Sequence, residues 1–110
     1  MEVFARLIEL KPGTDQRVRE WAEYINEHRA DANSTLRNER VEVESWFDVT
    51  LDGKRYLPCY MRAASLEEAR ATAEHSSSAV DAYHRQSKID TWVRGGGAVG
   101  RLLVDPAGSG

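Results

Sequence analysis

A predicted β-hairpin between Val41 and Arg62 is the feature that most constrains the fold of this chain. Two runs of alternating side chains, VEVESWFDVT and RYLPCYMR, flank the dipeptide Asp52-Gly53. An Asp-Gly pair in a two-residue turn is the strongest short-range signal for a hairpin, and such a turn also fixes the register. The expected opposite pairs are Thr50 with Arg55, Asp48 with Leu57, Trp46 with Cys59, Ser45 with Tyr60 and Glu44 with Met61.

Both faces of this hairpin carry large apolar side chains. The alternation places Val43, Ser45, Phe47, Val49, Tyr56, Pro58 and Tyr60 on one face, and Glu44, Trp46, Asp48, Leu57, Cys59 and Met61 on the other. A sheet with one solvated face does not show this pattern, so each face needs a cover. Pro58 lacks the N–H that an interior strand donates, and we expect a bulge near it or a strand that begins later.

The other predicted elements give the order β-α-β-β-α-(α)-β. Residues 2–10 predict a strand, and a helix follows from about Asp15, with Thr14 as N-cap, to near Asn38. Ser65 and Ser78 each open a capping pattern, which predicts helices to about Glu74 and about Trp92, and residues 98–105 predict a last strand. This is the split βαβ order of ferredoxin-like α+β folds, in which helices cover one face of a four-stranded antiparallel sheet.

The length and this order predict a single domain, residues 1–105, followed by a flexible tail, residues 106–110. A second copy of the chain is the simplest cover for the second sheet face, so we expect a homodimer. A net charge of -3 with interspersed signs argues against a nucleic-acid surface. The charged start of the chain and the lack of a long apolar run predict neither a signal peptide nor a membrane span. The single Cys59 favours a cytoplasmic protein.

The most suggestive polar cluster is Asp81, His84 and Arg85 on the last predicted helix. Spacings of three and four residues allow the Asp81 carboxylate to touch both other side chains. A carboxylate that orients an imidazole creates a general acid/base near neutral pH, and Arg85 could then hold a substrate oxygen. The alternative is structural, because Asp81 also completes the capping pattern and such charge pairs commonly decorate exposed helices.

Other candidates lie on the first helix and on both faces of the hairpin, and the sequence leaves open which sheet face lines the pocket. Glu44 beside Trp46, under a helix, would be partly desolvated, which raises a carboxyl pKa and suits proton transfer; the alternative is an ion pair with Arg85 or Arg62. His28 falls on the apolar stripe of the first helix, where a core histidine is the commoner outcome. Tyr60 and Tyr83 could form walls for a flat apolar ligand. The spacing of the three histidines predicts no metal site.

Three phrases, VEVESWF, YLPCYM and VDAYHRQ, together with the topology and length, resemble the dimeric α+β-barrel superfamily. This superfamily includes antibiotic-biosynthesis-type monooxygenases, muconolactone-type isomerases, mutarotases, polyketide cyclases and haem-degrading enzymes. More narrowly, Val43-Glu44-Ser45, Tyr56 with Tyr60, and Asp81 with His84-Arg85 are similar to the pattern of a small bacterial family of unassigned function. The resemblance spans about Val3 to Asp105, and Pro58 departs from it.

The resemblance implies a small cofactor-independent enzyme that acts on an apolar organic molecule by proton transfer, as an isomerase, a cyclase or a monooxygenase. His84 would be the acid/base, Asp81 its orienting partner and Arg85 the anion holder, with Glu44 and Tyr60 as polar groups of the pocket. Haem would require His75 or His84 as an axial ligand. The alternative is a non-catalytic dimer that binds a hydrophobic ligand or a protein, in which the same cluster serves as cap and salt bridge.

Overall fold

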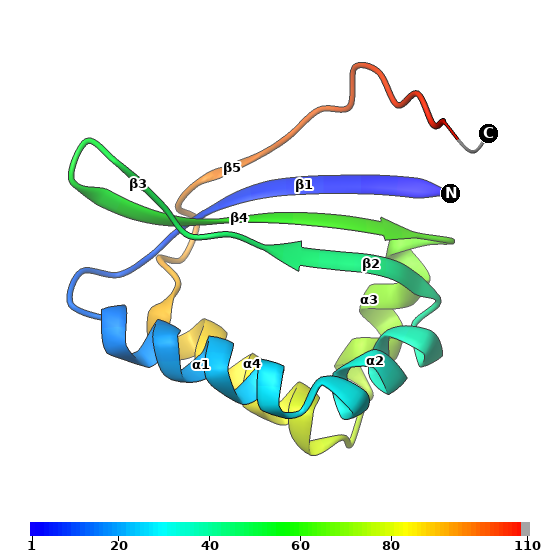
Figure 1. The fold of residues 1–110 in the computed structure, drawn as a ribbon, viewed down its shortest axis with the longest axis horizontal. Coiled ribbons are helices and arrows are strands. Elements are labelled where there is room, and N and C mark those ends of the chain that lie inside the picture. The colour runs from blue at the N-terminus through cyan, green and yellow to red at the C-terminus, as the bar shows by residue number, and fades with distance from the viewer. Residues whose placement is uncertain (109–110) are drawn as a thin grey trace.

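An antiparallel sheet forms one layer of the molecule and the helices form the other, in a computed structural model that describes residues 1–108 (Figure 1). Within those residues there are five strands and four helices. The strands are β1 (Glu2–Glu9), β2 (Val41–Trp46), β3 (Val49–Leu51), β4 (Lys54–Ala63) and β5 (Ala98–Val99). The sheet order is β2-β4-β1-β5, and β3 also pairs with β4. The protein is therefore an α+β fold with an open antiparallel sheet.

The predicted hairpin register is confirmed. Thr50 lies opposite Arg55 and Trp46 opposite Cys59, and the two pairs that follow Trp46 toward the start of β2 also agree with the prediction. At the turn, Asp52 and Gly53 have φ angles of 52° and 77°. Two successive positive φ angles define the type I′ turn that Asp-Gly favours, because this turn matches the twist of the strands.

Both expectations at Pro58, a bulge or a strand that begins later, are wrong, because β4 begins at Lys54 and its register is the same on either side of Pro58. The ladder is instead interrupted opposite this residue. The backbone N–H of Phe47 donates to the Pro58 carbonyl at 2.9 Å, but proline has no N–H to return the second bond of the pair. The long strand predicted before the turn consequently splits into β2 and β3, which gives five strands in place of four. The register shift in this hairpin lies between Val41 and Val43.

The predicted first helix is two helices, α1 (Asp15–Glu27) and α2 (Arg29–Asn38), which meet at His28. The Tyr24 carbonyl accepts the backbone N–H of His28 at 2.9 Å and also the His28 ring Nδ1 at 2.8 Å. A side chain that competes for a helix carbonyl bends the chain. Thr14 is not a side-chain cap, since its hydroxyl donates backward to the Lys11 carbonyl.

The two later helices, α3 (Leu66–Glu74) and α4 (Ala79–Thr91), form close to the predicted bounds. Ser65 Oγ accepts the backbone N–H of Glu68, and Ser78 Oγ accepts that of Asp81, so both predicted serine caps are confirmed. Among the described helices, none combines the length and the apolar composition needed to cross a membrane.

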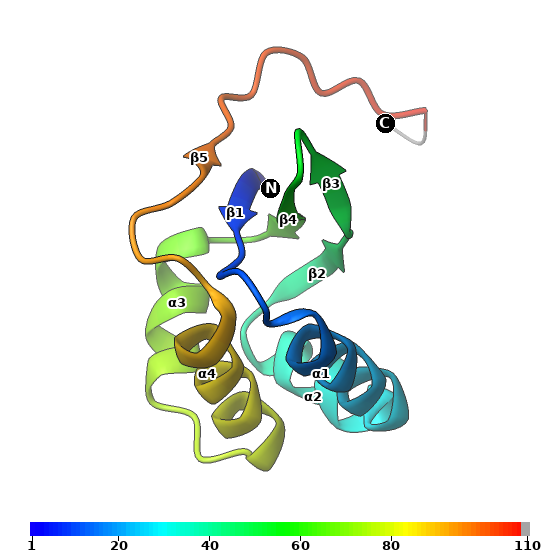
Figure 2. The same ribbon diagram turned by 90° about the vertical axis from the view of Figure 1, so that its left-hand side faces the viewer.

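The last predicted strand is much shorter than expected. β5 contains only Ala98 and Val99, and the chain then leaves the sheet and runs along its open side (Figures 1 and 2). Arg62 anchors this segment through two guanidinium hydrogen bonds to the Asp105 carboxylate. Residues 106–108 contain no helix or strand, and the rest of the expected tail lies outside the described residues.

The helices cover one sheet face, and the core lies beneath them. Its buried members include Ile8, Leu10, Val18, Trp21, Leu57 and Cys59. The other face remains uncovered and carries apolar side chains, with Phe47 57% exposed and Val99 68% exposed. Figure 2 shows the two helical arms, α1–α2 and α3–α4, below the sheet. The space between these arms and the sheet contains the candidate site.

Candidate functional site

A cavity of about 300 Å³ opens between α1, α2, α4 and the sheet. Half of its lining residues are apolar, among them Trp21, Ile25 and Trp46, and half are polar or charged, among them Arg29, Glu44, Asp81 and His84. Concave sites with apolar walls and converging polar groups are typical of small-molecule binding. Four of the predicted site residues (Glu44, Trp46, Asp81 and His84) therefore meet at one cavity.

Glu44 projects from β2 toward the helices. Burial raises its carboxyl pKa above the usual value of 4.5, while the positive charge of Lys88 and the indole of Trp46 act in the opposite direction. The predicted ion pairs with Arg62 or Arg85 are wrong, because Arg62 binds Asp105 and Arg85 binds backbone carbonyls of the α3–α4 connection. The predicted rise in pKa is confirmed, and it leaves a carboxyl in the cavity that can hold or release a proton.

His84 is enclosed by aromatic rings. Trp21 donates its indole N–H to His84 Nδ1 at 2.9 Å, and the ring centroids of Trp21 and Trp46 lie 5.8 and 5.5 Å from that of His84. Burial, and then the charges of Lys88 and Arg85, lower its pKa from 6.5 to about 3. Since an indole N–H can only donate, Nδ1 is the unprotonated nitrogen, and the neutral ring carries its proton on Nε2.

The expected contact network of Asp81, His84 and Arg85 does not form. His84 Nδ1 accepts its hydrogen bond from Trp21, and the predicted orienting contact from Asp81 is not formed. Arg85 is exposed and donates to the carbonyls of Ala73 and Ser76, which ties the end of α3 to α4. A buried neutral imidazole with so low a pKa is a poor general base at neutral pH. His84 can therefore act as a hydrogen-bond donor through Nε2–H.

Three predicted site residues lie elsewhere. Tyr60 is on the open sheet face, where its hydroxyl accepts from Arg62 Nε. The Tyr83 ring stacks on the Tyr24 ring with a centroid distance of 3.8 Å, and its hydroxyl accepts a hydrogen bond from Arg17. The His28 ring also stacks on Tyr24, with a centroid distance of 4.0 Å. None of the three lines the cavity; the Tyr83 and His28 side chains pack between helices, and Tyr60 lies on the opposite side of the sheet.

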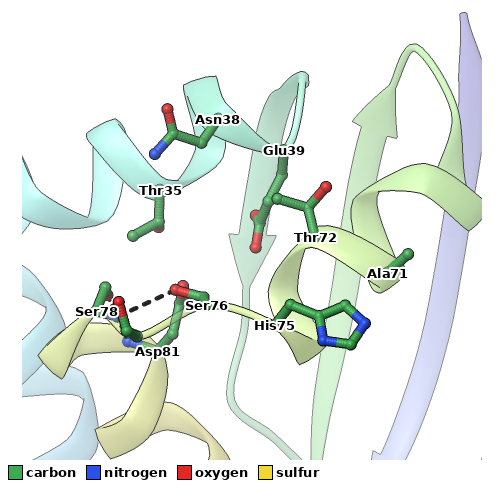
Figure 3. Close-up of a pocket in the computed structure, with 10 residues that line it drawn as sticks. Thr35, Asn38, Glu39, Ala71, Thr72, His75, Ser76, Ser78 and Asp81 are labelled. Atoms are coloured by element: carbon green, nitrogen blue, oxygen red, sulfur yellow. Dashed lines mark hydrogen bonds between the residues drawn. The ribbon is translucent and has the colours of Figure 1, made fainter.

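A second, larger cavity of about 600 Å³ lies between the end of α2 and the α3–α4 connection (Figure 3). Glu39, which ends α2, points its carboxylate into this space from one side, and Ser76, Ser78 and Asp81 face it from the other (Figure 3). Burial, followed by the negative charges of Asp81 and Glu44, raises the pKa of Glu39 from 4.5 to about 7.

Glu39 was not predicted from the sequence. It follows a helix without any motif, and its surroundings exist only because the fold brings α4 and β2 beside it. The hydroxyl residues Ser76-Ser77-Ser78 are the one local feature of the sequence near this cavity.

Two further ionisable groups lie deeper under α4. Burial lowers the pKa of Lys88, whose Nζ lies 5.1 Å from the centroid of the Trp92 ring, and the charge of Glu44 opposes that shift. Burial raises the pKa of the Cys59 thiol to about 12, so the thiol stays protonated and unreactive. Cys59 is thus a small apolar core residue.

The donor set gives no support to a metal or haem site. Within residues 1–108 no group of three or more His, Cys, Asp and Glu side chains is placed to hold a metal ion. Of the two histidines considered as haem ligands, His84 is fixed by Trp21, and His75 is exposed beside a cavity lined with hydroxyl groups. Haem requires an accessible imidazole in an apolar pocket, and neither residue meets that requirement.

Comparison with known proteins gives one match. Residues 1–106 match a family of unknown function, DUF6176. No curated protein and no solved structure shows significant similarity to the chain.

Proposed function

We propose that this chain, which belongs to the family of unknown function DUF6176, is a small enzyme that transfers protons on an apolar organic substrate. The observation that carries the proposal is a partly buried carboxyl, Glu44, with a raised pKa inside an aromatic cavity. A substrate with an acidic C–H next to a carbonyl would lose that proton to the Glu44 carboxylate and regain it at the same or a neighbouring carbon. Such a cycle isomerises or cyclises a substrate and consumes no cofactor.

The roles of the residues differ from those first expected. Glu44 becomes the acid/base, because burial moves its pKa toward neutrality, where a general base works best. His84 becomes a neutral hydrogen-bond donor through Nε2–H, suited to the oxygen of a developing enolate. Trp21 is a positioning residue, since its N–H fixes the tautomer of His84.

Solvent deuterium exchange tests the chemistry without knowledge of the natural substrate. Aromatic ketones with acidic C–H groups, such as 2-tetralone and benzoylacetone, would be incubated with the protein in D₂O, and the loss of the C–H signal followed by proton NMR. We expect faster exchange of at least one compound than in buffer alone. Glu44→Gln should reduce that rate about 100-fold or more, the usual contribution of a general base.

Glu42→Gln is the matched control, because Glu42 lies on the same strand and is exposed to solvent. This variant should exchange at the wild-type rate. If Glu44→Gln is as fast as wild type, Glu44 is not the base. If the wild-type protein binds compounds of the panel but exchanges none, the non-catalytic binding module becomes the better description.

We also propose that the fold is ferredoxin-like and that the protein is a homodimer. The sheet order supports the first point when β3 is counted as a continuation of β2, which leaves four strands in the ferredoxin-like arrangement. The uncovered face supports the second, because Phe47, Val99 and the segment with Leu102, Leu103 and Val104 leave much apolar surface in water. A second copy of the chain would cover both the exposed sheet face and this segment.

A further inference from the structure

The two cavities described above adjoin, and we call them together the cleft. Thr35 and Asp81 belong to the walls of both. The inner part has apolar walls from Trp21, Trp46, Ile25 and Val80, together with polar residues that include Arg29 and Glu44. The outer part is walled by hydroxyl and carboxyl groups from the end of α2 and the α3–α4 connection (Figure 3). A ligand that fills both parts needs one apolar end and one polar end.

The charged groups of the outer part determine whether the polar end of a ligand should be a cation or an anion. Glu39 follows α2 and Asp81 lies on α4, and within residues 1–108 neither carboxylate has a hydrogen-bond or ion-pair partner from another side chain. No Lys or Arg side chain lines this part, and His75 is the only other ionisable group in its described walls. Two unpaired carboxylates repel an anion and attract a cation.

We propose that the cleft binds an amphipathic amine, with an aromatic or aliphatic group in the inner part and a protonated amino group between Glu39 and Asp81. This names the substrate class of the proposed enzyme and rests on the same cleft. The surrounding hydroxyl groups of Thr72 and Ser77 can accept the remaining N–H bonds of an ammonium group. The reacting carbon of such a ligand would then lie in the inner part, near Glu44.

The ionisation of Glu39 provides a signature of this binding mode. The charged groups acting on it are Asp81 and Lys88 from α4 and Glu44 from β2, and with a pKa of about 7 it is near half-protonated at neutral pH. A bound ammonium group favours the carboxylate form, so binding should release a proton. A neutral ligand of the same shape should release none.

Calorimetry with three probes tests the proposal: 2-phenylethylamine, 2-phenylethanol and 3-phenylpropionate. We expect the amine to bind about tenfold or more tightly than the carboxylate. Titrations at pH 7 in two buffers of different ionisation enthalpy should show release of about half a proton for the amine only. Between pH 6 and pH 8 the affinity for the amine should rise, whereas that for the alcohol should not.

Glu39→Gln should abolish the proton release and weaken amine binding about five- to tenfold while leaving alcohol binding unchanged. Glu67→Gln, an exposed carboxylate on α3, is the matched control and should behave as wild type. If Glu39→Gln does not fold, Asp81→Asn and the pH series on the wild-type protein test the same point. Equal or tighter binding of the carboxylate, or amine binding without proton release, would overturn the proposal.

The deuterium-exchange assay separates this proposal from the one on which it rests. Exchange that depends on Glu44, together with no preference for the amine, removes the cation site and leaves the proton-transfer enzyme. A preference for the amine that depends on Glu39, together with no exchange of any compound, supports the cation site and removes the catalytic role.

Discussion

The Trp21 indole and the His84 imidazole fix each other, and their contact decides what His84 can do. The indole N–H donates to Nδ1 at 2.9 Å inside a cluster that also contains Trp46 and Trp92. A protonated imidazole would lose this bond, because both of its nitrogens would then be donors. Burial and hydrogen bonding thus both favour the neutral ring.

This arrangement predicts a specific dependence of stability on pH. His84 has a pKa of about 3 in the folded protein, against 6.5 when unfolded, so the unfolded chain binds one more proton between these values. Its contribution to stability is complete above pH 6.5 and is lost as the pH falls toward 3. In urea unfolding between pH 6 and 4.5, His84→Gln should lower the slope of unfolding free energy against pH by about 1 kcal/mol per pH unit.

The slope of unfolding free energy against pH must be compared between the variant and the wild-type protein, because two carboxyl groups affect stability in the direction opposite to His84. The raised pKa values of Glu39 and Glu44 stabilise the fold at low pH, and that contribution is lost as the pH rises through their folded values. His75→Gln, in an exposed loop, is the control and should keep the wild-type slope. An unchanged slope in His84→Gln would show that His84 titrates alike in both states.

At the level of single residues, the sequence identified residues that line the cavity better than it identified their hydrogen-bond partners. Glu44 and Trp46 were predicted to share one hairpin face, and both line the cavity, because strand alternation and the hairpin turn fix which residues share a face. Apolar residues on both faces left open which of the two faces lines the pocket. The partner of His84 could not be found in the same way. Trp21 comes from a helix 63 residues away, and no local spacing encodes that contact.

Among the elements, those with strong local signals were predicted well and those that depend on distant contacts were not. The hairpin register and the two serine caps depend on neighbouring residues, and they agree with the structure. At His28, where the helix breaks, the imidazole bonds to a helix carbonyl, and β5 pairs with the distant strand β1 at two positions only. The apolar periodicity of the sequence indicates neither the break nor the short strand.

Gly97, directly before β5, provides a testable prediction about how this strand is held. Gly97 has a φ of +91°, and a Cβ atom added to it would lie 1.8 Å from the Leu7 carbonyl oxygen of β1. Gly97→Ala must therefore separate β5 from β1. We expect a loss of about 2 kcal/mol or more in unfolding free energy, from the strained backbone and the clash together, measured by urea denaturation.

Gly95→Ala is the matched control. Gly95 has a similar φ of +74°, but nothing lies within 4 Å of the added Cβ. Its cost should be limited to backbone strain, about 1 kcal/mol. Equal losses in the two variants would mean that the close approach of Gly97 to Leu7 does not hold β5 in place.

At the scale of the whole molecule, the two sheet faces are very unequal. The helices bury one face, whereas the other keeps Phe47, Val49 and Val99 exposed. The chain after β5 runs along the same side of the sheet (Figure 1), and its Leu102, Leu103 and Val104 side chains are exposed. The sequence predicted this imbalance correctly, because apolar residues alternate on both hairpin faces while the helices can cover only one.

The proposed dimer makes the last prediction. Light scattering at micromolar concentration should give twice the 12.4 kDa of one chain. Phe47→Glu would bury a charge in the interface and should give monomers, since an unpaired buried carboxylate costs several kcal/mol. Ile89→Glu is the control, because Ile89 is 66% exposed but belongs to α4 on the helix side, and this variant should remain dimeric. A monomeric wild-type protein would leave the apolar face without its proposed cover and would contradict the dimer directly.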